Sequence, residues 1–296
     1  MHYPLEIEDS IVTIKNSLGN YAESENLGSL EELSPDTAAG MIRAMAACTI
    51  DGTIVTNARQ KLAGRQLQDG RVALSPQTPH IHWYTALAIL AWTQAPGFEK
   101  NLQRAISFLL RTSGIHCAVN ADSAVSHDTS LNGWPWISGT HSWVEPTATA
   151  LIALKANGHE KHERTKDAVR MLLDRQLPGG GWNYGNTFVY GTEMRPIPEY
   201  TAIALSALHG YVAYEKVKNS LEYLTRELET IRTPLTLSRG ICALGIWSQR
   251  PKNSDDCIIE SIRRQKRCGP YSMTLLSEIL IAFLTTDGIT IRFCKG

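Results

Sequence analysis

Three stretches of the chain repeat one pattern: YTALAILAWTQ (residues 84–94), PTATALIALKANG (146–158) and YTAIALSALHG (200–210). Each has Thr-Ala near its start, small and apolar residues at helical spacing, and a Leu/Ala pair near its end. Apolar residues at this spacing predict an α-helix, and recurrence of one helix predicts a repeat architecture. A fourth copy and two weaker copies are DTAAGMIRAMAAC (36–48), LSRGICALGIW (237–247) and YSMTLLSEILIAF (271–283).

A second type of helix lies between these copies. Its members carry charges along one face and apolar residues along the other, and they fall at residues 57–70, 101–114, 165–181, 217–228 and 255–269. Ala-rich helices that alternate with amphipathic ones suit an inner and an outer layer. About six such pairs predict an all-α fold, an α/α toroid. The alternative is an open solenoid, which would require distinct polar capping repeats.

The totals of the sequence set the domain organisation and exclude some partners. We expect an N-terminal helical extension over residues 1–35 and one toroid domain over 36–296, with an aromatic-rich insertion at about 112–144. The chain has 29 basic and 29 acidic residues, so no basic field predicts a nucleic-acid partner. No run of about 18 apolar residues predicts a membrane span, and no signal segment is expected. We therefore expect a cytoplasmic protein; peripheral membrane contact and oligomeric state stay open.

The stretch RQLPGGGWNYG (175–185) ends one amphipathic helix with three consecutive glycines and a tryptophan. One Gly in a left-handed conformation suffices to end a helix, so three glycines suggest a further constraint. The stretch resembles the QW motif of squalene and oxidosqualene cyclases, class II diterpene cyclases and protein prenyltransferase β subunits. The resemblance implies that Gln176 caps a neighbouring helix and that Trp182 ties adjacent repeats together. Weaker copies retain Gln66 and Gln265, and the resemblance spans residues 36–290.

The same resemblance implies a catalytic acid. Class II cyclases donate a proton from the middle carboxyl of a D-x-D-D-T-A motif, and Thr147 anchors that motif on SWVEPTA (142–148). Glu145 then takes the position of the acid, while Trp143 and Pro146 replace the flanking aspartates. A carboxyl group enclosed by aromatic residues has a raised pKa and can act as a proton donor.

Two further acidic residues precede a Thr-Ala pair at a similar offset. Glu199 stands two residues before Thr201, as Glu145 does before Thr147, and Asp36 stands one residue before Thr37. Glu199 is a second candidate catalytic residue. The alternative for all three acids is a position in the first turn of a helix, where a carboxylate stabilises the helix dipole.

Aromatic residues gather in the insertion and around the repeat starts. Aromatic faces stabilise carbocations, so we expect an aromatic cavity that binds an apolar substrate. His141, beside Trp143, is a candidate to orient Glu145 or to shuttle a proton. The alternative for Trp134 or Trp136 is a structural role like that of Trp182. The expected substrate-binding residues are Trp83, Trp134, Trp136, Trp143, Trp182, Tyr184 and Tyr200.

No cofactor is predicted. Asp255 and Cys257 match the Asp-x-Cys pair of the protein prenyltransferase zinc site, but no histidine follows His209 to complete it. The sequence has no phosphate-binding loop and no dinucleotide-binding fingerprint. We therefore expect neither a metal nor an organic cofactor.

The resemblance predicts a terpene-cyclase-like isomerase of natural-product biosynthesis, which isomerises or cyclises an isoprenoid substrate by protonation from Glu145. One alternative is an acid–base enzyme acting on a non-terpene natural-product intermediate. Another is a non-catalytic toroid scaffold that binds a protein partner. A deep cavity with Glu145 at its wall favours an enzyme, whereas a filled centre favours the scaffold.

Overall fold

The structure is a computed structural model that describes residues 3–24, 33–50, 52–75, 77–118 and 124–286. Apart from one small hairpin and isolated bridges, the regular structure over these residues is helical, which confirms the all-α prediction. The hairpin pairs β1 (Phe188–Val189) with β2 (Thr192–Glu193) in antiparallel register. No helix in the described part of the chain is long and apolar enough to cross a membrane.

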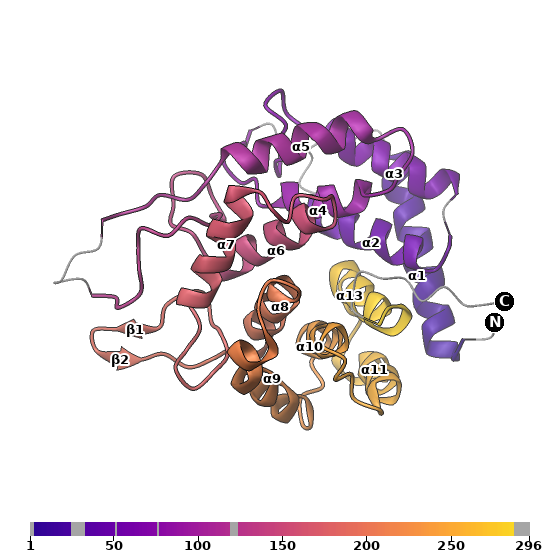
Figure 1. Cartoon of the computed structure of the whole chain (residues 1–296). Coiled ribbons are helices and arrows are strands. Elements are labelled where there is room, and N and C mark those ends of the chain that lie inside the picture. Colours follow the sequence, from indigo (N-terminus) through magenta and orange to yellow (C-terminus); the bar gives the residue numbers. More distant parts are fainter. Residues whose placement is uncertain (1–2, 25–32, 51, 76, 119–123, 287–296) are drawn as a thin grey trace.

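The repeated Ala-rich segments form the inner layer. They are α2 (Pro35–Ala47), α4 (Tyr84–Trp92), α6 (Val144–Lys155), α8 (Pro198–Leu208), α10 (Pro234–Ile246) and α13 (Met273–Leu284). Each packs against the next in this order, and α13 packs against α2, so the contacts form a closed cycle (Figure 1). Small residues allow this close approach: a Cβ atom added to Gly40 would lie 3.5 Å from Cβ of Ser277.

The amphipathic segments form the outer layer. They are α1 (Leu5–Glu23), α3 (Thr53–Gly64), α5 (Glu99–Arg111), α7 (Glu163–Asp174), α9 (Tyr214–Leu228) and α11 (Ser254–Arg263), followed by the short α12 (Gln265–Cys268). Their apolar faces pack on the inner helices, and the buried apolar core lies between the two layers. The N-terminal helix α1 contacts both α11 and α3, and therefore occupies the outer position beside α13 and α2.

The glycine turn after α7 joins three helices around Trp182. The indole Nε1 of this fully buried residue donates a hydrogen bond to the Leu172 carbonyl of α7 (2.7 Å), and its backbone N–H donates to Thr201 Oγ1 of α8 (2.9 Å). The side chain of Gln176 donates to Ser220 Oγ of α9 (2.8 Å). The turn therefore connects α7 to both helices of the next pair.

Two of the three glycines in this turn are required by their surroundings. Gly180 and Gly181 have φ values of 96° and 83°, a region that L side chains rarely adopt. A Cβ atom on Gly181 would also lie 2.7 Å from Cβ of Pro196, whereas one on Gly179 would meet nothing within 4 Å. Close packing around Trp182 thus accounts for Gly180 and Gly181.

Similar contacts recur in other repeats with different residues. Trp134 donates from Nε1 to the Leu109 carbonyl of α5 (3.0 Å) and from its backbone N–H to Thr147 Oγ1 (2.9 Å). In the loop before α4, the backbone N–H of Val72 donates to Thr85 Oγ1 (2.9 Å). Thr85, Thr147 and Thr201 therefore fix the preceding loop to the start of α4, α6 and α8.

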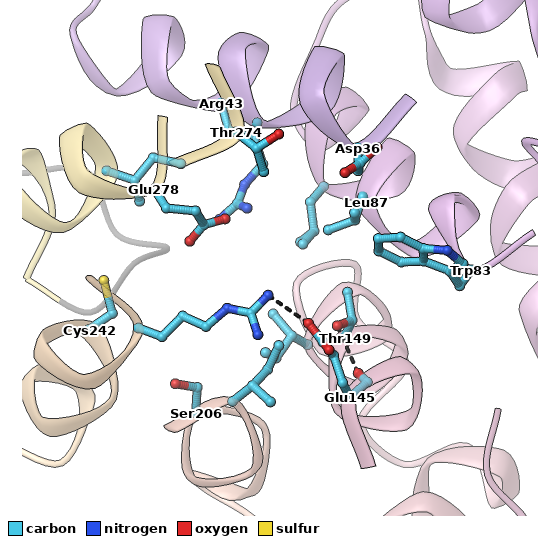
Figure 2. Close-up of a pocket in the computed structure, with 16 residues that line it drawn as sticks. Asp36, Arg43, Trp83, Leu87, Glu145, Thr149, Ser206, Cys242, Thr274 and Glu278 are labelled. Carbon is cyan, nitrogen blue, oxygen red and sulfur yellow. Dashed lines mark hydrogen bonds and ion pairs between the residues drawn. The ribbon is translucent and has the colours of Figure 1, made fainter. Parts of the chain in front are cut away.

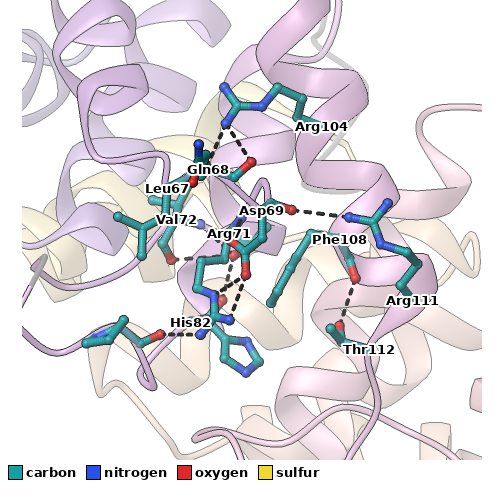
Figure 3. Close-up of polar contacts among 12 residues, drawn as sticks. Leu67, Gln68, Asp69, Arg71, Val72, His82, Arg104, Phe108, Arg111 and Thr112 are labelled. Atoms are coloured by element: carbon teal, nitrogen blue, oxygen red, sulfur yellow. Dashed lines mark hydrogen bonds and ion pairs between the residues drawn. The ribbon is translucent and has the colours of Figure 1, made fainter.

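A cluster of polar contacts holds the loop before α4 (Figure 3). Arg71 Nε donates to Asp69 Oδ2 (2.7 Å), and its guanidinium lies 5.3 Å from the centroid of the Phe108 ring. The buried imidazole of His82 contacts the same ring, edge to face, with centroids 5.1 Å apart. Burial, reinforced by the positive charge of Arg71, lowers the pKa of His82 to about 4.

We expect the free energy of unfolding to decrease by about 3 kcal/mol as the pH falls from about 6.5 to 4, because of His82. In that window the unfolded chain binds a proton on His82 that the folded chain excludes, so acid favours unfolding. Urea unfolding at pH 7.5 and pH 4.5 measures the difference. The variant His82→Leu should lose most of this pH dependence; an equal pH dependence in variant and wild type would contradict the assignment.

Candidate functional site

A cavity of about 140 Å³ lies on the axis of the inner layer, and all six inner helices line it, with Trp83 at the start of α4 (Figure 2). The lining residues follow helical spacing. On α2 they are Asp36, Gly40 and Arg43, and on α6 they include Glu145 and Thr149. The cavity is therefore the hollow centre of the closed cycle, and the axial face of each helix determines its chemistry.

An ion pair crosses this cavity. Arg239 Nη2 of α10 lies 2.6 Å from Glu145 Oε1 of α6, and the two side chains are 21% and 12% exposed. In the cycle α8 separates these two helices, so the long Arg239 side chain spans the hollow to reach Glu145. Burial alone would lower the pKa of Arg239, but the carboxylates of Glu145 and Glu278 raise it above its ordinary value.

Three more charged residues face the same space. Figure 2 shows Glu278 of α13 and Arg43 of α2 near each other at one wall, and Asp36 near Trp83 at another. Within the described residues, neither Asp36 nor Glu278 has a hydrogen-bond or ion-pair partner. The cavity thus contains three carboxyl groups and two guanidinium groups, two of the carboxyls without a direct partner.

The repeat position that holds Glu145 has different roles in neighbouring helices. Trp83, Glu145 and Glu199 each stand two residues before the repeat threonine. Trp83 and Glu145 line the cavity, as expected for substrate-binding and catalytic residues. Glu199 does not line it and instead accepts a hydrogen bond from Thr236 Oγ1 of α10. Its position corresponds to the alternative interpretation, a carboxylate in the first turn of its helix.

One predicted tyrosine, Tyr200, lies near Glu145, and a second, Tyr184, packs against Tyr200. Burial, followed by the charge of Glu145, raises the pKa of the half-buried Tyr200. Tyr184 is 53% exposed, and its ring centroid lies 4.6 Å from that of Tyr200. Both tyrosines lie near the N-terminal end of α8, on the side of the cavity where Glu145 lies. Neither of them lines the cavity.

Four of the five predicted tryptophans lie elsewhere than expected. Trp134 and Trp182 are buried. The indole N–H of Trp134 donates to a carbonyl in the last turn of α5, and that of Trp182 donates to one in the last turn of α7. The last four carbonyls of a helix have no partner within the helix, so each indole satisfies one of them. Trp136 packs behind Trp83, with ring centroids 4.9 Å apart. Trp143 lines a second, separate cavity. Only Trp83 among the predicted tryptophans lines the central cavity, so its wall is not the expected aromatic one.

His141 is also placed away from the central cavity. Its side chain is exposed, and it lines the second cavity together with Trp143. Within the part of the chain that the structure describes, no direct contact joins His141 to Glu145. The predicted pairing of these two residues therefore has no counterpart in the arrangement of the site.

Sequence reasoning missed Arg43, Arg239 and Glu278. Arg239 and Glu278 are the only charged residues of α10 and α13, and Arg43 is the only basic residue of α2, which also contains Asp36. A charged residue in such a helix must face either the hollow centre or solvent, because an unpaired charge in the core is too costly. A search for charged residues within the six Ala-rich segments would have found all three.

The prenyltransferase-like Asp-x-Cys pair lies outside the cavity. Asp255 accepts a hydrogen bond from Arg250 Nη2 (3.0 Å), and Cys257 is buried on the inner face of α11. No group of three or more potential metal ligands occurs among the described residues. The five described cysteines are free, and Cys294 lies outside the described residues.

Comparison with known proteins identifies the fold only. No family model matches the sequence, and no curated protein matches it. A protein from Actinoplanes is similar in structure, with a TM-score of 0.54 and 16% identity over 90% of this chain and 83% of that one. A novel alpha-amylase from Clostridium perfringens has a TM-score of 0.59 and 9% identity, over 94% of this chain and 97% of that one. Salmonella alpha-2-macroglobulin reacted with methylamine has a TM-score of 0.50 and 12% identity, over 95% of this chain but only 17% of that one.

Proposed function

We propose that the chain is an α/α toroid and an acid–base enzyme whose active site is the central cavity, with Glu145 as the catalytic residue. The closed cycle of inner helices supports the toroid, since an open solenoid would leave α2 and α13 apart. The observation that carries the function is the Glu145–Arg239 pair at the wall of a hollow lined by all six inner helices. A hollow centre with opposed charges favours an enzyme over the scaffold alternative.

The proposed chemistry is proton transfer. Glu145 pairs with the guanidinium of Arg239, and in this arrangement it acts first as a base that accepts a proton from the substrate. Arg239 then stabilises the negative charge that develops on the substrate, because it already lies at hydrogen-bond distance from the reacting carboxyl group. Return of the proton to another atom of the substrate completes an isomerisation without a cofactor.

The substrate is a small polar molecule. A cavity of about 140 Å³ is close to one of about 150 Å³ that accommodates benzene. The five charged residues of the wall favour polar groups on the ligand, and Trp83 with the aliphatic side chains Leu87 and Ile203 covers its apolar part. A non-terpene intermediate fits this cavity better than a long polyprenyl chain.

Terpene-cyclase-like chemistry is the second candidate, and the apolar part of the wall favours it. Leu90, Ile152 and Ile281 line the cavity with Trp83. In this case Glu145 must be protonated and released from Arg239 before it can donate a proton to an alkene. An isoprenoid substrate would also have to extend into an adjoining cavity of about 240 Å³, which shares Arg43, Leu90 and Ile281 with the central one.

The test compares the wild type with Glu145→Gln in a mixture of cellular metabolites, followed by mass spectrometry. We expect a small polar compound to be converted by the wild type and about 100-fold more slowly by the variant, since the amide cannot transfer the proton. The matched control is Glu199→Gln, at the same repeat position but outside the cavity, which should keep its rate.

The outcomes separate the candidates. Conversion of an isoprenoid that depends on Glu145 would favour terpene chemistry. Equal rates in wild type and Glu145→Gln would contradict the role of Glu145. Absence of any converted compound, with stable capture of one protein, would favour the scaffold. Equal melting temperatures must accompany each comparison, so that loss of folding is not mistaken for loss of chemistry.

A further inference from the structure

A second cavity, of about 150 Å³, lies between the insertion and the loop that follows Trp182. It shares no lining residue with the central cavity. In Figure 1 this region is the group of loops beside α7 that leads to the β1–β2 hairpin. Its polar wall consists of Arg175, His127, His141, Thr129, Ser142 and Asn186, and no carboxylate of the described residues lines it.

Arg175 is a buried cation with unused hydrogen-bond donors. It is 4% exposed, and its Nη2 donates to the Asp128 carbonyl (3.1 Å). Its Nε and Nη1 atoms are buried without a hydrogen-bond partner. The nearest carboxylate oxygen, Asp174 Oδ2, lies 3.7 Å from Nε and accepts a hydrogen bond from the backbone N–H of Asp128. Buried donors of a charged group that stay unpaired are costly, so a ligand there would be stabilised.

Arg175 stays charged despite its burial. Desolvation lowers the pKa of its guanidinium to about 10, which is still well above neutral pH. His127 lines the same cavity, and its Nδ1 atom is also buried without a hydrogen-bond partner; it is a donor when the ring carries a proton on Nδ1. A guanidinium and an imidazole nitrogen, both with unused hydrogen-bonding capacity, therefore adjoin one space.

We propose that this cavity binds the oxyanion of a small organic acid, a carboxylate or a phosphate monoester. The guanidinium of Arg175 and the imidazole of His127 donate hydrogen bonds to the oxyanion. The apolar part of the ligand packs against Leu131 and Trp143, which line the same cavity. Trp143 directly precedes α6, so an occupied cavity would also fix the start of the helix that carries Glu145.

The experiment titrates the full chain with benzoate, phosphate and benzamide by isothermal titration calorimetry. We expect saturable binding of benzoate or phosphate at one site, and binding of the neutral isostere benzamide about tenfold weaker or worse, because charge-assisted hydrogen bonds contribute about 1.5–3 kcal/mol. Arg175→Met should lower the affinity for the anion by about the same factor.

Arg164→Met is the matched control. Arg164 also has buried Nε and Nη1 atoms without hydrogen-bond partners, but its guanidinium lies 4.3 Å from the Trp134 ring centroid and does not line the cavity. Its substitution should leave anion binding unchanged. His127→Leu provides a second test if Arg175→Met does not fold. It should also lower the affinity for the anion.

Two results would overturn the proposal: no saturable heat with either anion, or equal anion affinity in the wild type, Arg175→Met and His127→Leu. Benzoate binding without phosphate binding assigns the site to carboxylates, and the reverse assigns it to phosphate esters. The same titration on Glu145→Gln should give wild-type affinity for the anion. This site is therefore tested independently of the proposed function of the central cavity.

Discussion

Trp182→Ala is expected to lower the free energy of unfolding by about 3–5 kcal/mol, as large aromatic-to-alanine changes in a core do. The change removes a fully buried side chain and leaves a void between α7 and α8. It also leaves the Leu172 carbonyl without the indole donor. Urea unfolding monitored by circular dichroism measures the difference.

The control for this change is Tyr184→Ala, two residues further along the same loop. Tyr184 is 53% exposed, so its loss should alter the free energy of unfolding far less than that of Trp182. Equal destabilisation by the two variants would show that the loop as a whole, rather than the buried indole, stabilises this part of the ring. An unchanged midpoint for Trp182→Ala would contradict its role in joining repeats.

Arg239→Met is expected to lower the free energy of unfolding by about 1–3 kcal/mol. It leaves the carboxylate of Glu145, 12% exposed at the wall of the cavity, without the cation that lies 2.6 Å away, and a charged group that loses its partner in a largely buried place destabilises the fold. The variant should therefore unfold at a lower urea concentration than the wild type at neutral pH.

The double variant Glu145→Gln with Arg239→Met distinguishes a charge effect from lost packing. Once Glu145 carries no charge, replacing Arg239 should cost much less, because no unpaired carboxylate remains. A double-mutant cycle with no coupling would indicate that the guanidinium acts through its packing alone. We expect strong coupling, because the charged groups of the two side chains are in direct contact.

The all-α character of the fold could be predicted from the sequence because its signals are local. The Thr-Ala segments mark the inner helices, and the positive φ values of Gly180 and Gly181 explain a run of glycines that a helix end alone does not need. The hydroxyl groups of Thr85, Thr147 and Thr201 bond the preceding loops, which is why these residues recur at the start of the repeat.

The site could be predicted only in part, because it depends on which helix face points to the axis. Glu145 was found through the resemblance of SWVEPTA to the cyclase acid motif, and Trp83 through its aromatic ring; both line the cavity. Arg239 and Glu278 were missed, since their helices are the weakest copies and only the closed cycle brings these side chains to the wall of one cavity. Aromatic content did not show which tryptophans would bind helix carbonyls instead of substrate, as Trp134 does.

Contact between α13 and α2 has a consequence for how the chain folds. The hydroxyl groups of Thr37 and Thr274 lie 2.7 Å apart although 237 positions separate them in the sequence. Neighbouring helix pairs assemble from local contacts, which form quickly, but this seam closes only after the last inner helix has been synthesised. Until then α2 and α10 each expose an apolar face of the kind that α13 covers, and two unfinished chains can exchange it. We therefore expect ring closure to be the slow folding step, and the one at which domain swapping can occur.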